Sequence, residues 1–311
     1  MKKELVVKDN VLIEASYNLD LVEQRLILLA IIEARESGKG INAHDPLSIH
    51  AESYINQFAV HRNGAYQALK NAAKDLFVRQ FSYQERRSKG LANVTSRWVS
   101  EIAYIEDAAC VELIFAPAII PLITRLEEHF TSYELEQISK LNSGYAIRLY
   151  ELIIAWRSTG KTPVISYEDL RKKLGVLDHE YKVKADFKKR VLDSSLKQIN
   201  EHTDITVKHE QHKTGREITG FSFRFKQKPQ PKNTDKKLPQ RDPNTQDMFV
   251  SMTDAQRYMF GAKLAKRIEL SEYSSGTESY EEFGKRIAEM LLDETKFKTF
   301  YPLLVEEGFR S

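Results

Sequence analysis

Apolar residues recur at three- and four-residue steps along much of the chain, and each such stretch predicts an amphipathic helix. Two of these stretches are 143–157 and 184–200. In the first, one face gathers Tyr145, Leu149, Leu152 and Trp156. In the second, the apolar face gathers Phe187, Val191, Leu192, Leu196 and Ile199. At about 100° per residue, the opposite face of the second helix gathers Lys189, Arg190, Asp193 and Lys197. Solvation alone is one reading of that charged face.

The segments around these two helices complete an order of elements. Ser166, with Asp169 three residues on, resembles a capping box at the start of a short helix. Gly175 suits the end of that helix, and Gly215 suits the turn of a β-hairpin. The order is helix, short strand, short helix, helix and two strands, at 143–157, 162–165, 166–174, 184–200, 204–210 and 218–225. A helix-turn-helix followed by a hairpin is the plan of a winged-helix domain.

The same order of elements occurs nearer the N-terminus. Two helices and three strands are predicted there, at 51–60, 63–78, 80–86, 102–105 and 111–115. The basic turn 87–90 lies among the strands. We therefore predict an α+β protein with two tandem winged-helix domains that share an architecture without a sequence repeat.

A strongly apolar helix is predicted at 19–34, with Asn18 as its N-cap, after an extended piece within residues 1–12. Apolar residues cover more than half of its circumference. The helix therefore either fills the core or also contacts a second copy of the chain, and both readings stay open.

The remaining segments set the predicted domain limits. Helices at 122–130 and 132–141 join the two winged helices, and 226–244 is a Pro/Lys/Gln-rich linker. Helices follow at 253–268, 279–295 and 296–309. We predict a first winged-helix domain, a linker helix with the second, a linker, and a C-terminal helical appendage, at 1–121, 122–228, 229–252 and 253–311.

Composition narrows the possible functions. The 311 residues are 41% hydrophobic and 29% charged, with a net charge of +3, so a nucleic-acid signal must come from local clusters. The single cysteine, Cys110, excludes a disulfide framework, and its apolar surroundings predict a buried thiol. The longest apolar run, 26–32, is too short to span a membrane, and no signal peptide is recognisable. We therefore predict a cytoplasmic protein without a membrane partner.

Enzymatic motifs are missing from the sequence. No GxxxxGK[ST] loop is present, and the eight histidines form no His-hydrophobe-His triplet of the kind that nicking enzymes use with a tyrosine. His209 and His212 are three residues apart, but no second pair of ligands accompanies them. We predict no enzyme, no catalytic residue, no metal and no cofactor.

Cationic and amide side chains cluster on the predicted helices and hairpin tips of both halves. Such clusters are the electrostatic signature of a surface that binds a phosphate backbone. In the first half the candidates for DNA binding are Arg62, Asn63, Gln67, Lys70, Lys74, Arg87 and Lys89. In the second half they are Lys184, Lys188, Lys189, Arg190, Lys197, Lys208, Lys213 and Arg216.

Particular runs of residues also resemble a known family. Over about residues 5–228 the chain is similar to the iteron-type plasmid replication initiators. The runs that carry the resemblance are 7–10, 21–26, 145–152, 186–192, 199–200, 215–216 and 221–223.

The resemblance implies a function in plasmid replication. Proteins of this family bind direct repeats, or iterons, in double-stranded origin DNA as monomers. They help melt an AT-rich element and bring in the host helicase, with the chromosomal initiator as a further partner. A homodimer in equilibrium with the monomer represses their own promoter, mainly through contacts of the first domain. The resemblance places 184–197 in a major groove, 63–78 in a neighbouring groove, and the hairpin tips at Gly90 and Gly215 on phosphates.

Chemistry sorts the candidates by role. Lys189, Arg190 and Lys197 suit base edges or phosphates, because Arg contacts guanine bidentately. Lys208, Lys213 and Arg216 suit phosphates alone. Two arginines have a structural alternative, in which Arg148 pairs with Glu151 and Arg190 with Asp193. Two rival functions also stay open: a repressor with tandem winged helices that binds an inverted repeat, and a scaffold that binds only proteins.

Overall fold

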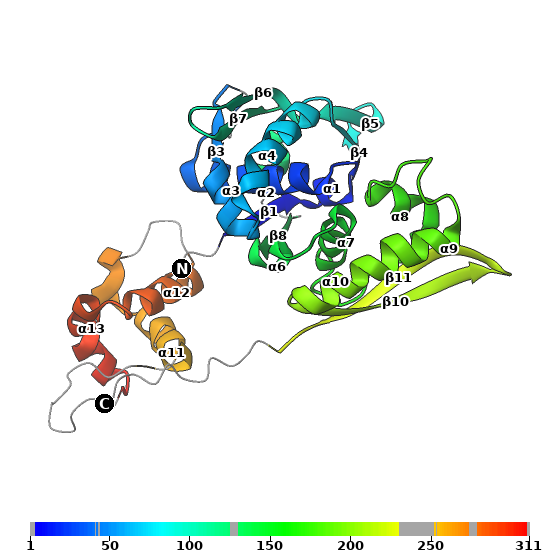
Figure 1. Cartoon of the computed structure of the whole chain (residues 1–311). Coiled ribbons are helices and arrows are strands. Elements are labelled where there is room, and N and C mark those ends of the chain that lie inside the picture. Colours follow the sequence, from blue (N-terminus) through cyan, green and yellow to red (C-terminus); the bar gives the residue numbers. More distant parts are fainter. Residues whose placement is uncertain are drawn as a thin grey trace. The chain divides into compact units, whose positions relative to one another are not determined.

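The computed structural model describes residues 4–40, 42, 44–124, 130–229, 252, 254–273 and 279–309. The chain splits into two compact units, Met1–Lys232 and Asn233–Ser311. Each unit has its own apolar core, and Figure 1 shows the helices and strands of each. The first unit contains two modules of mixed helix and strand, which we call the first module (residues 4–141) and the second module (residues 142–229).

The first module is built around helix α2 and three small antiparallel sheets. The sheets have the strand orders β1-β8, β2-β4-β5 and β3-β7-β6. Its helices are α1 Asn10–Glu14, α2 Leu21–Ser37, α3 Ala51–Phe58, α4 Arg62–Leu76, α5 Ile120–Thr124 and α6 Glu136–Ser139. Its strands are β1 Leu5–Asp9, β2 Ser16–Tyr17, β3 Leu47–His50, β4 Gln80–Arg87, β5 Gly90–Arg97, β6 Val99–Ile105, β7 Cys110–Phe115 and β8 Phe130–Glu134.

Helix α2 fills the core of the first module. Its apolar run, Leu26–Ile32, is buried, and this confirms the core reading of the helix. Asn18 is not its N-cap: the cap is Asp20, whose side chain accepts from the Glu23 amide in a full capping box. The Cys110 thiol is buried as predicted.

The helix predicted at 132–141 is wrong at its start. Phe130–Glu134 forms β8, which pairs antiparallel with β1, so that Val6 faces Tyr133. Only the short α6 follows. Pairing with β1, at the start of the chain, overrides the local pattern and makes this segment part of the first module's sheets.

The second module follows the predicted winged-helix order. Its elements are α7 Gly144–Ile154, β9 Ile165–Ser166, α8 Tyr167–Lys173, α9 Lys184–Asp186, the π-helical segment η1 Phe187–Asp193, α10 Ser194–His202, β10 Ile205–Thr214 and β11 Glu217–Gln227. The sheet order is β10-β11-β9. The hairpin pairs out to Thr214 and Glu217, further than predicted, and Gly215 closes it with φ at 62°. α10 lies along one face of the hairpin (Figure 1).

The C-terminal unit consists of three α-helices and one 3₁₀ turn over its described residues. They are α11 Asp254–Leu264, η2 Ile268–Tyr273, α12 Tyr280–Met290 and α13 Glu294–Glu306. Residue 253, where the first of these helices was predicted to begin, lies outside the described residues. Helices α11 and α12 come so close that a Cβ added at Gly261 would lie 2.4 Å from the Gly284 carbonyl oxygen. Phe297, Phe300 and Leu304 of α13 are buried in this unit's core.

A buried charged cluster ties the two modules of the first unit together. The carboxylate of Glu151, in α7, accepts from Lys8 Nζ at 2.6 Å and from the Tyr133 hydroxyl at 2.6 Å. Arg148 donates to the same carboxylate at 2.7 Å. Lys8 lies in β1 and Tyr133 in β8, so one carboxylate of the second module binds two strands of the first. We call Lys8, Tyr133, Arg148 and Glu151 the junction cluster.

Arg148 extends this tie to the backbone of the first module. Its guanidinium donates to the carbonyls of Ile13 and Ala15 at 2.9 and 3.0 Å, and lies 4.0 Å from the centre of the Tyr17 ring. The structural alternative for Arg148, pairing with Glu151, is therefore confirmed.

Gly175 makes the second close contact between the modules. Its φ is 76°, and an added Cβ would lie 2.3 Å from the Tyr17 carbonyl oxygen. Asn18 donates to the Gly175 carbonyl at 2.5 Å. Any side chain at this position would strain its own backbone and push the modules apart.

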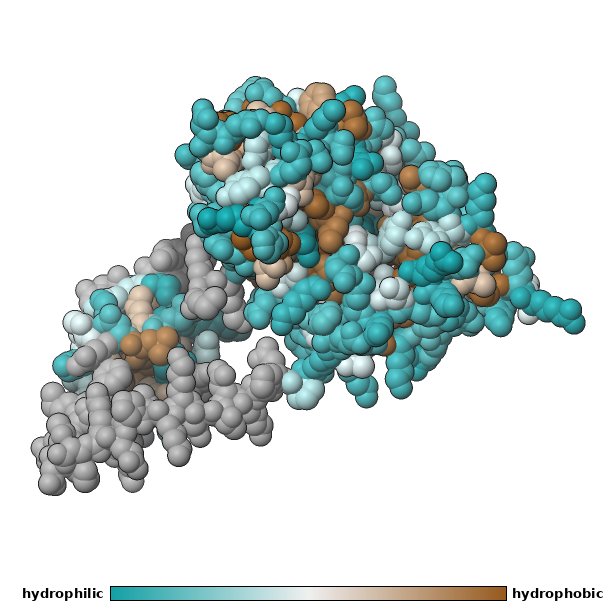
Figure 2. All heavy atoms as spheres, in the orientation of Figure 1, coloured by the Kyte–Doolittle hydropathy of each residue, from teal (hydrophilic) through white to brown (hydrophobic). Residues whose placement is uncertain are grey.

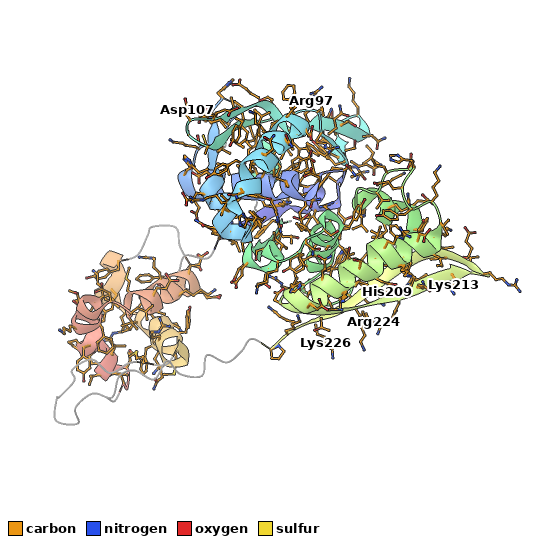
Figure 3. All side chains as sticks on the ribbon, in the orientation of Figure 1. Arg97, Asp107, His209, Lys213, Arg224 and Lys226 are labelled. Carbon is orange, nitrogen blue, oxygen red and sulfur yellow. The ribbon has the colours of Figure 1, made fainter. Side chains whose placement is uncertain are left out.

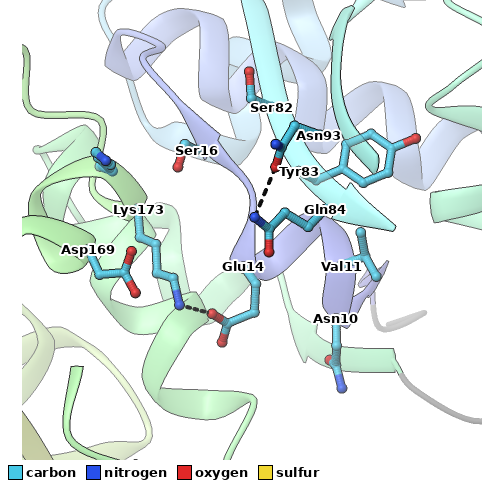
Figure 4. A pocket seen from close by; sticks show the side chains of 11 residues that line it. Asn10, Val11, Glu14, Ser16, Ser82, Tyr83, Gln84, Asn93, Asp169 and Lys173 are labelled. Carbon is cyan, nitrogen blue, oxygen red and sulfur yellow. Dashed lines mark hydrogen bonds and ion pairs between the residues drawn. The ribbon is translucent and has the colours of Figure 1, made fainter. Parts of the chain in front are cut away.

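A hollow of about 630 Å³ opens beside this junction, and most of the residues that line it, from both modules, are polar (Figure 4). The ion pair between Glu14 and Lys173 crosses it, and Gln84 donates to Asn93 at 2.9 Å on the first module's side. The face of the molecule in Figure 2 is mostly hydrophilic, with apolar residues showing in patches.

The junction cluster makes the free energy of unfolding of the first unit depend on pH. Burial raises the pKa of Glu151, but the charges of Lys8 and Arg148 outweigh burial and bring that pKa to about 2, from an ordinary 4.5. The folded chain therefore holds this proton more weakly than the unfolded chain does. The resulting stabilisation is complete above pH 4.5 and is lost as the pH falls toward 2.

We predict that Glu151→Gln lowers the free energy of unfolding of the first unit by about 3–5 kcal/mol at pH 7, because Lys8 and Arg148 remain buried without a counter-charge. Urea unfolding at pH 7 and at steps below pH 4.5 checks this. The gap between wild type and variant should narrow as the pH falls. Glu101→Gln, which removes an exposed carboxylate, is the matched control and should cost little at any pH. A gap that is absent at pH 7 or independent of pH would contradict the role given to Glu151.

Candidate nucleic-acid interface

The helix of the second module that follows the turn is continuous from Lys184 to His202 through α9, η1 and α10. We call it the second-module recognition helix. Its predicted apolar side is buried: Phe187, Val191, Leu192, Leu196 and Ile199. Its exposed side carries Lys189, Arg190 and Lys197. This arrangement leaves three cations directed to solvent from a helix that is fixed along its other side.

The sequence pattern predicted an α-helix over the whole of 184–200, but the recognition helix is α-helical only in part. Phe187–Asp193 is π-helical, which widens the turn and changes the phase of the residues after it. Asp193 pairs with Lys188, at 2.7 and 3.0 Å, and not with Arg190. The alternative in which Arg190 pairs with Asp193 is therefore wrong. The ion-pair partner of Arg190 is Asp186, at 4.0 Å, and 69% of the Arg190 side chain is exposed.

Lys184 fastens the start of the recognition helix to the hairpin. Its Nζ lies 2.6 Å from Glu217 and donates to the Ile218 carbonyl at 3.0 Å. It also lies 4.8 Å from the centre of the Tyr167 ring. Lys184 and Lys188 are thus engaged within the protein, whereas no ion-pair partner of Lys189 is found among the described residues.

Two residues that the sequence analysis missed hold the recognition helix in place. Arg171, buried in α8, donates to the carbonyls of Leu177, Glu180 and Tyr181 at 3.0, 2.7 and 2.9 Å, and so fixes the turn before the helix. A signal for this existed, because position 171 falls in the apolar stripe between Tyr167 and Leu174. A charged residue in such a stripe needs buried partners.

Asn200 fixes the other end of the recognition helix. Its side chain exchanges two hydrogen bonds with the Val207 backbone, at 2.6 and 3.1 Å. Lys228 donates to the Asn200 carbonyl at 2.5 Å and to the Thr203 carbonyl at 2.8 Å. Helix and hairpin are therefore joined at both ends.

The hairpin cations of the second module divide between two places. Lys213 and Arg216 are exposed on either side of the turn at Gly215, and Figure 3 labels Lys213 near the tip. Lys208 lies in mid-strand and points away from the recognition helix, because its neighbour His209 faces that helix. Burial lowers the pKa of His209, and the nearby charge of Lys188 lowers it further. The structure does not bring Lys208 together with Lys189 and Lys197.

Helix α4 is the corresponding helix of the first module. Leu69, Ala72, Ala73 and Leu76 are buried, and the opposite side exposes Arg62, Asn63, Gln67, Lys70 and Lys74. Three of the exposed residues have protein partners: Arg62 pairs with Glu52 at 2.6 Å, Gln67 donates to Asn71 at 2.9 Å, and Lys70 pairs with Glu106. The carboxylates of Glu52 and Glu106 offset part of the positive charge of this helix.

The hairpin of the first module, β4–β5, carries the remaining candidates. Arg87 pairs with Glu85, and Lys89 is exposed at the tip. Gly90 has φ at 129°, a conformation that favours glycine.

The described residues also bear on metal binding and on membrane spans. No group of three or more His, Cys, Asp or Glu side chains there is placed to hold a metal ion. His212 instead shares a 2.9 Å hydrogen bond with the Ser222 hydroxyl. In the same part of the chain, every helix falls short of the length and apolar character needed to cross a membrane.

Two solved structures are similar to parts of this chain. The Pi initiator protein, in a crystal structure of its complex with iteron DNA, is 23% identical, with a TM-score of 0.59 over 72% of this chain and 98% of that one. The WH1 domain of MSBI1.176, a replication protein isolated from a multiple sclerosis patient, is 74% identical over 39% of this chain and 93% of that one, with a TM-score of 0.34.

Two Escherichia coli proteins are also similar. An uncharacterized 27.6 kDa protein is 27% identical over 237 residues, which are 73% of this chain and 97% of that protein. A replication initiation protein is 23% identical over 211 residues, which are 67% of this chain and 65% of that protein.

Family models match two stretches of the first unit in sequence. Residues 5–154, which are the first module together with helix α7 of the second, match the model described as initiator replication protein, WH1. Residues 166–225 match the model described as initiator Rep protein, WH2. The two matches cover more than half of the chain, and it therefore belongs to the family of initiator replication proteins with two winged-helix domains.

Proposed function

We propose that this protein initiates plasmid replication by binding iterons, directly repeated sites in duplex DNA, with both winged helices at once. The observation that carries the proposal is the junction cluster. It joins two modules that each expose a helix with cationic and amide side chains. Two such helices held in one unit suit a single duplex, because successive major-groove segments recur with each helical turn.

The exposed groups of each helix suit different parts of the duplex. Arg190 suits a bidentate contact to guanine, and Lys189 and Lys197 suit phosphates. In the first module, Asn63 and Gln67 suit adenine, which an amide contacts bidentately. Lys184 and Lys188 have a supporting role in this proposal, since their ion pairs already hold the recognition helix to the hairpin and within itself.

The Pi initiator protein supports the choice of target. Its structure was solved with iteron DNA, and its fold is similar to that of this chain. We extend the proposal to the later steps that the resemblance implies: melting of an adjacent AT-rich element, recruitment of the host helicase and chromosomal initiator, and a homodimer in equilibrium with the monomer.

We predict that Lys189→Ala with Arg190→Ala abolishes specific binding to direct repeats without unfolding the protein. A base-reading Arg contributes about 1–3 kcal/mol of discrimination, and both side chains are exposed. DNase footprinting over the direct repeats near the coding frame measures this, with circular dichroism as the check on folding. Lys39→Ala with Lys140→Ala removes the same charge from other exposed positions and should keep the footprint.

Two results would count against this assignment. An unchanged footprint in the double variant would remove the recognition helix from sequence reading. Protection of an inverted repeat at a promoter, without protection of direct repeats, would favour the repressor over the initiator.

We predict that Lys74→Ala weakens binding to all duplexes alike. Lys74 is exposed in the last turn of α4, where it suits a phosphate and not a base edge. Loss of one phosphate contact should lower the slope of log affinity against log salt by about 0.9. Titrations of specific and unrelated duplexes at several salt concentrations measure the slope, with Lys39→Ala as the control. A loss confined to the specific duplex would show that Lys74 reads a base.

A further inference from the structure

Four cationic side chains lie on the sheet face of the second module that is turned away from the recognition helix. Arg224, in β11, lies directly opposite Lys208 of β10 on one side and Lys161 on the other. Residues that face one another across antiparallel strands have side chains on the same face. Lys226 is two residues beyond Arg224 and shares that face (Figure 3). We call Lys161, Lys208, Arg224 and Lys226 the cation row; all four are exposed.

The cation row is unfavourable for the fold by itself. Like charges directly opposite on a sheet destabilise it. Arg224 has one compensating carboxylate, Glu210, at 2.9 Å. Lys161, Lys208 and Lys226 have no ion-pair partner in the part of the chain that the structure describes. Four cations against one carboxylate leave this face with a charge of +3. A repulsive arrangement of this kind calls for an anion from outside the sheet.

The cation row is mounted on a rigid support. The segment that carries Lys161 is bonded to β11: the Phe225 amide donates to the Gly160 carbonyl at 2.9 Å, and the Thr162 amide to the Phe223 carbonyl at 2.9 Å. The row lines a shallow hollow of about 770 Å³. The surface thus exists before any ligand arrives.

The shape and composition of the row indicate the ligand. The charges are spread across two strands and the segment bridged to β11 at Lys161, and do not converge on one point, which suits an extended polyanion and not a small anion. Lysine is depleted at the core of protein–protein interfaces, whereas Lys and Arg are the usual partners of phosphates. We propose that the cation row binds the phosphate backbone of a second DNA duplex, of any sequence. The inference rests on the proposed function in one respect only, that a first duplex occupies the recognition helices.

The test uses the full chain and two labelled duplexes. The protein is first saturated with a duplex of direct repeats, an unrelated duplex is added, and mass photometry counts duplexes per chain. Wild type should carry both duplexes on one chain. Lys161→Gln with Arg224→Gln and Lys226→Gln should retain the first duplex and bind the second at least about tenfold more weakly, because up to three phosphate contacts are lost. A thermal melt of the variant should be no lower than that of wild type, since like charges have been removed.

The matched control is Lys39→Gln with Lys140→Gln and Lys266→Gln, which removes the same charge from other exposed positions. It should retain both duplexes. The inference is overturned if both triple variants lose the second duplex equally, if wild type takes up only single strands, or if two duplexes are held only by pairs of chains. Loss of the first duplex in the Lys189→Ala, Arg190→Ala variant, with the unrelated duplex still bound, separates the cation row from the recognition helix.

Discussion

The carboxylate of Glu151 is the point on which the first unit depends. It lies wholly inside the protein, yet it keeps its charge because Lys8 and Arg148 surround it and Tyr133 donates to it. A charge in such a place is stable only with all of its partners present. Lys8 and Tyr133 belong to the first module and Glu151 to the second, so the requirement for pairing is also a requirement that the modules stay together.

Because the two modules stay together, it matters which cations of the surface are paired within the protein and which remain exposed. In the second module, Lys184 pairs with Glu217 and so joins the recognition helix to its hairpin. Lys188 pairs with Asp193 inside the same helix. Lys189, Arg190 and Lys197 remain exposed on that same helix. The cation row lies on the other side of the hairpin, where it cannot act on the same duplex contact. The second module thus has two basic surfaces, the exposed side of the recognition helix and the cation row, and we assign them to different duplexes.

Patterns within a few residues of sequence correctly predicted those features that are decided by interactions between near neighbours along the chain. The winged-helix order, the turn glycines and the exposed side of α4 all follow from periodicity and from φ requirements within a few residues. The segment of β8 was predicted to be helical because its pairing partner, β1, is distant in sequence, at the start of the chain. The junction cluster joins residues as far as 143 positions apart, which no periodicity encodes. The π-helical turn of the recognition helix was likewise not visible, because it changes the phase of the helix without changing its apolar pattern.

The central claim is that the junction cluster fixes the two modules so that they bind one duplex together. The most direct test is the affinity of the full chain for a lengthened binding site. A duplex selected by the chain from a random pool would receive about five extra base pairs, roughly half a helical turn, between the segments that the two modules protect. A fixed junction predicts that binding falls at least about tenfold, because one helix must then leave its groove or the junction must break. Unchanged affinity for the lengthened duplex would mean that the modules move independently on DNA, and would contradict the role given to Glu151.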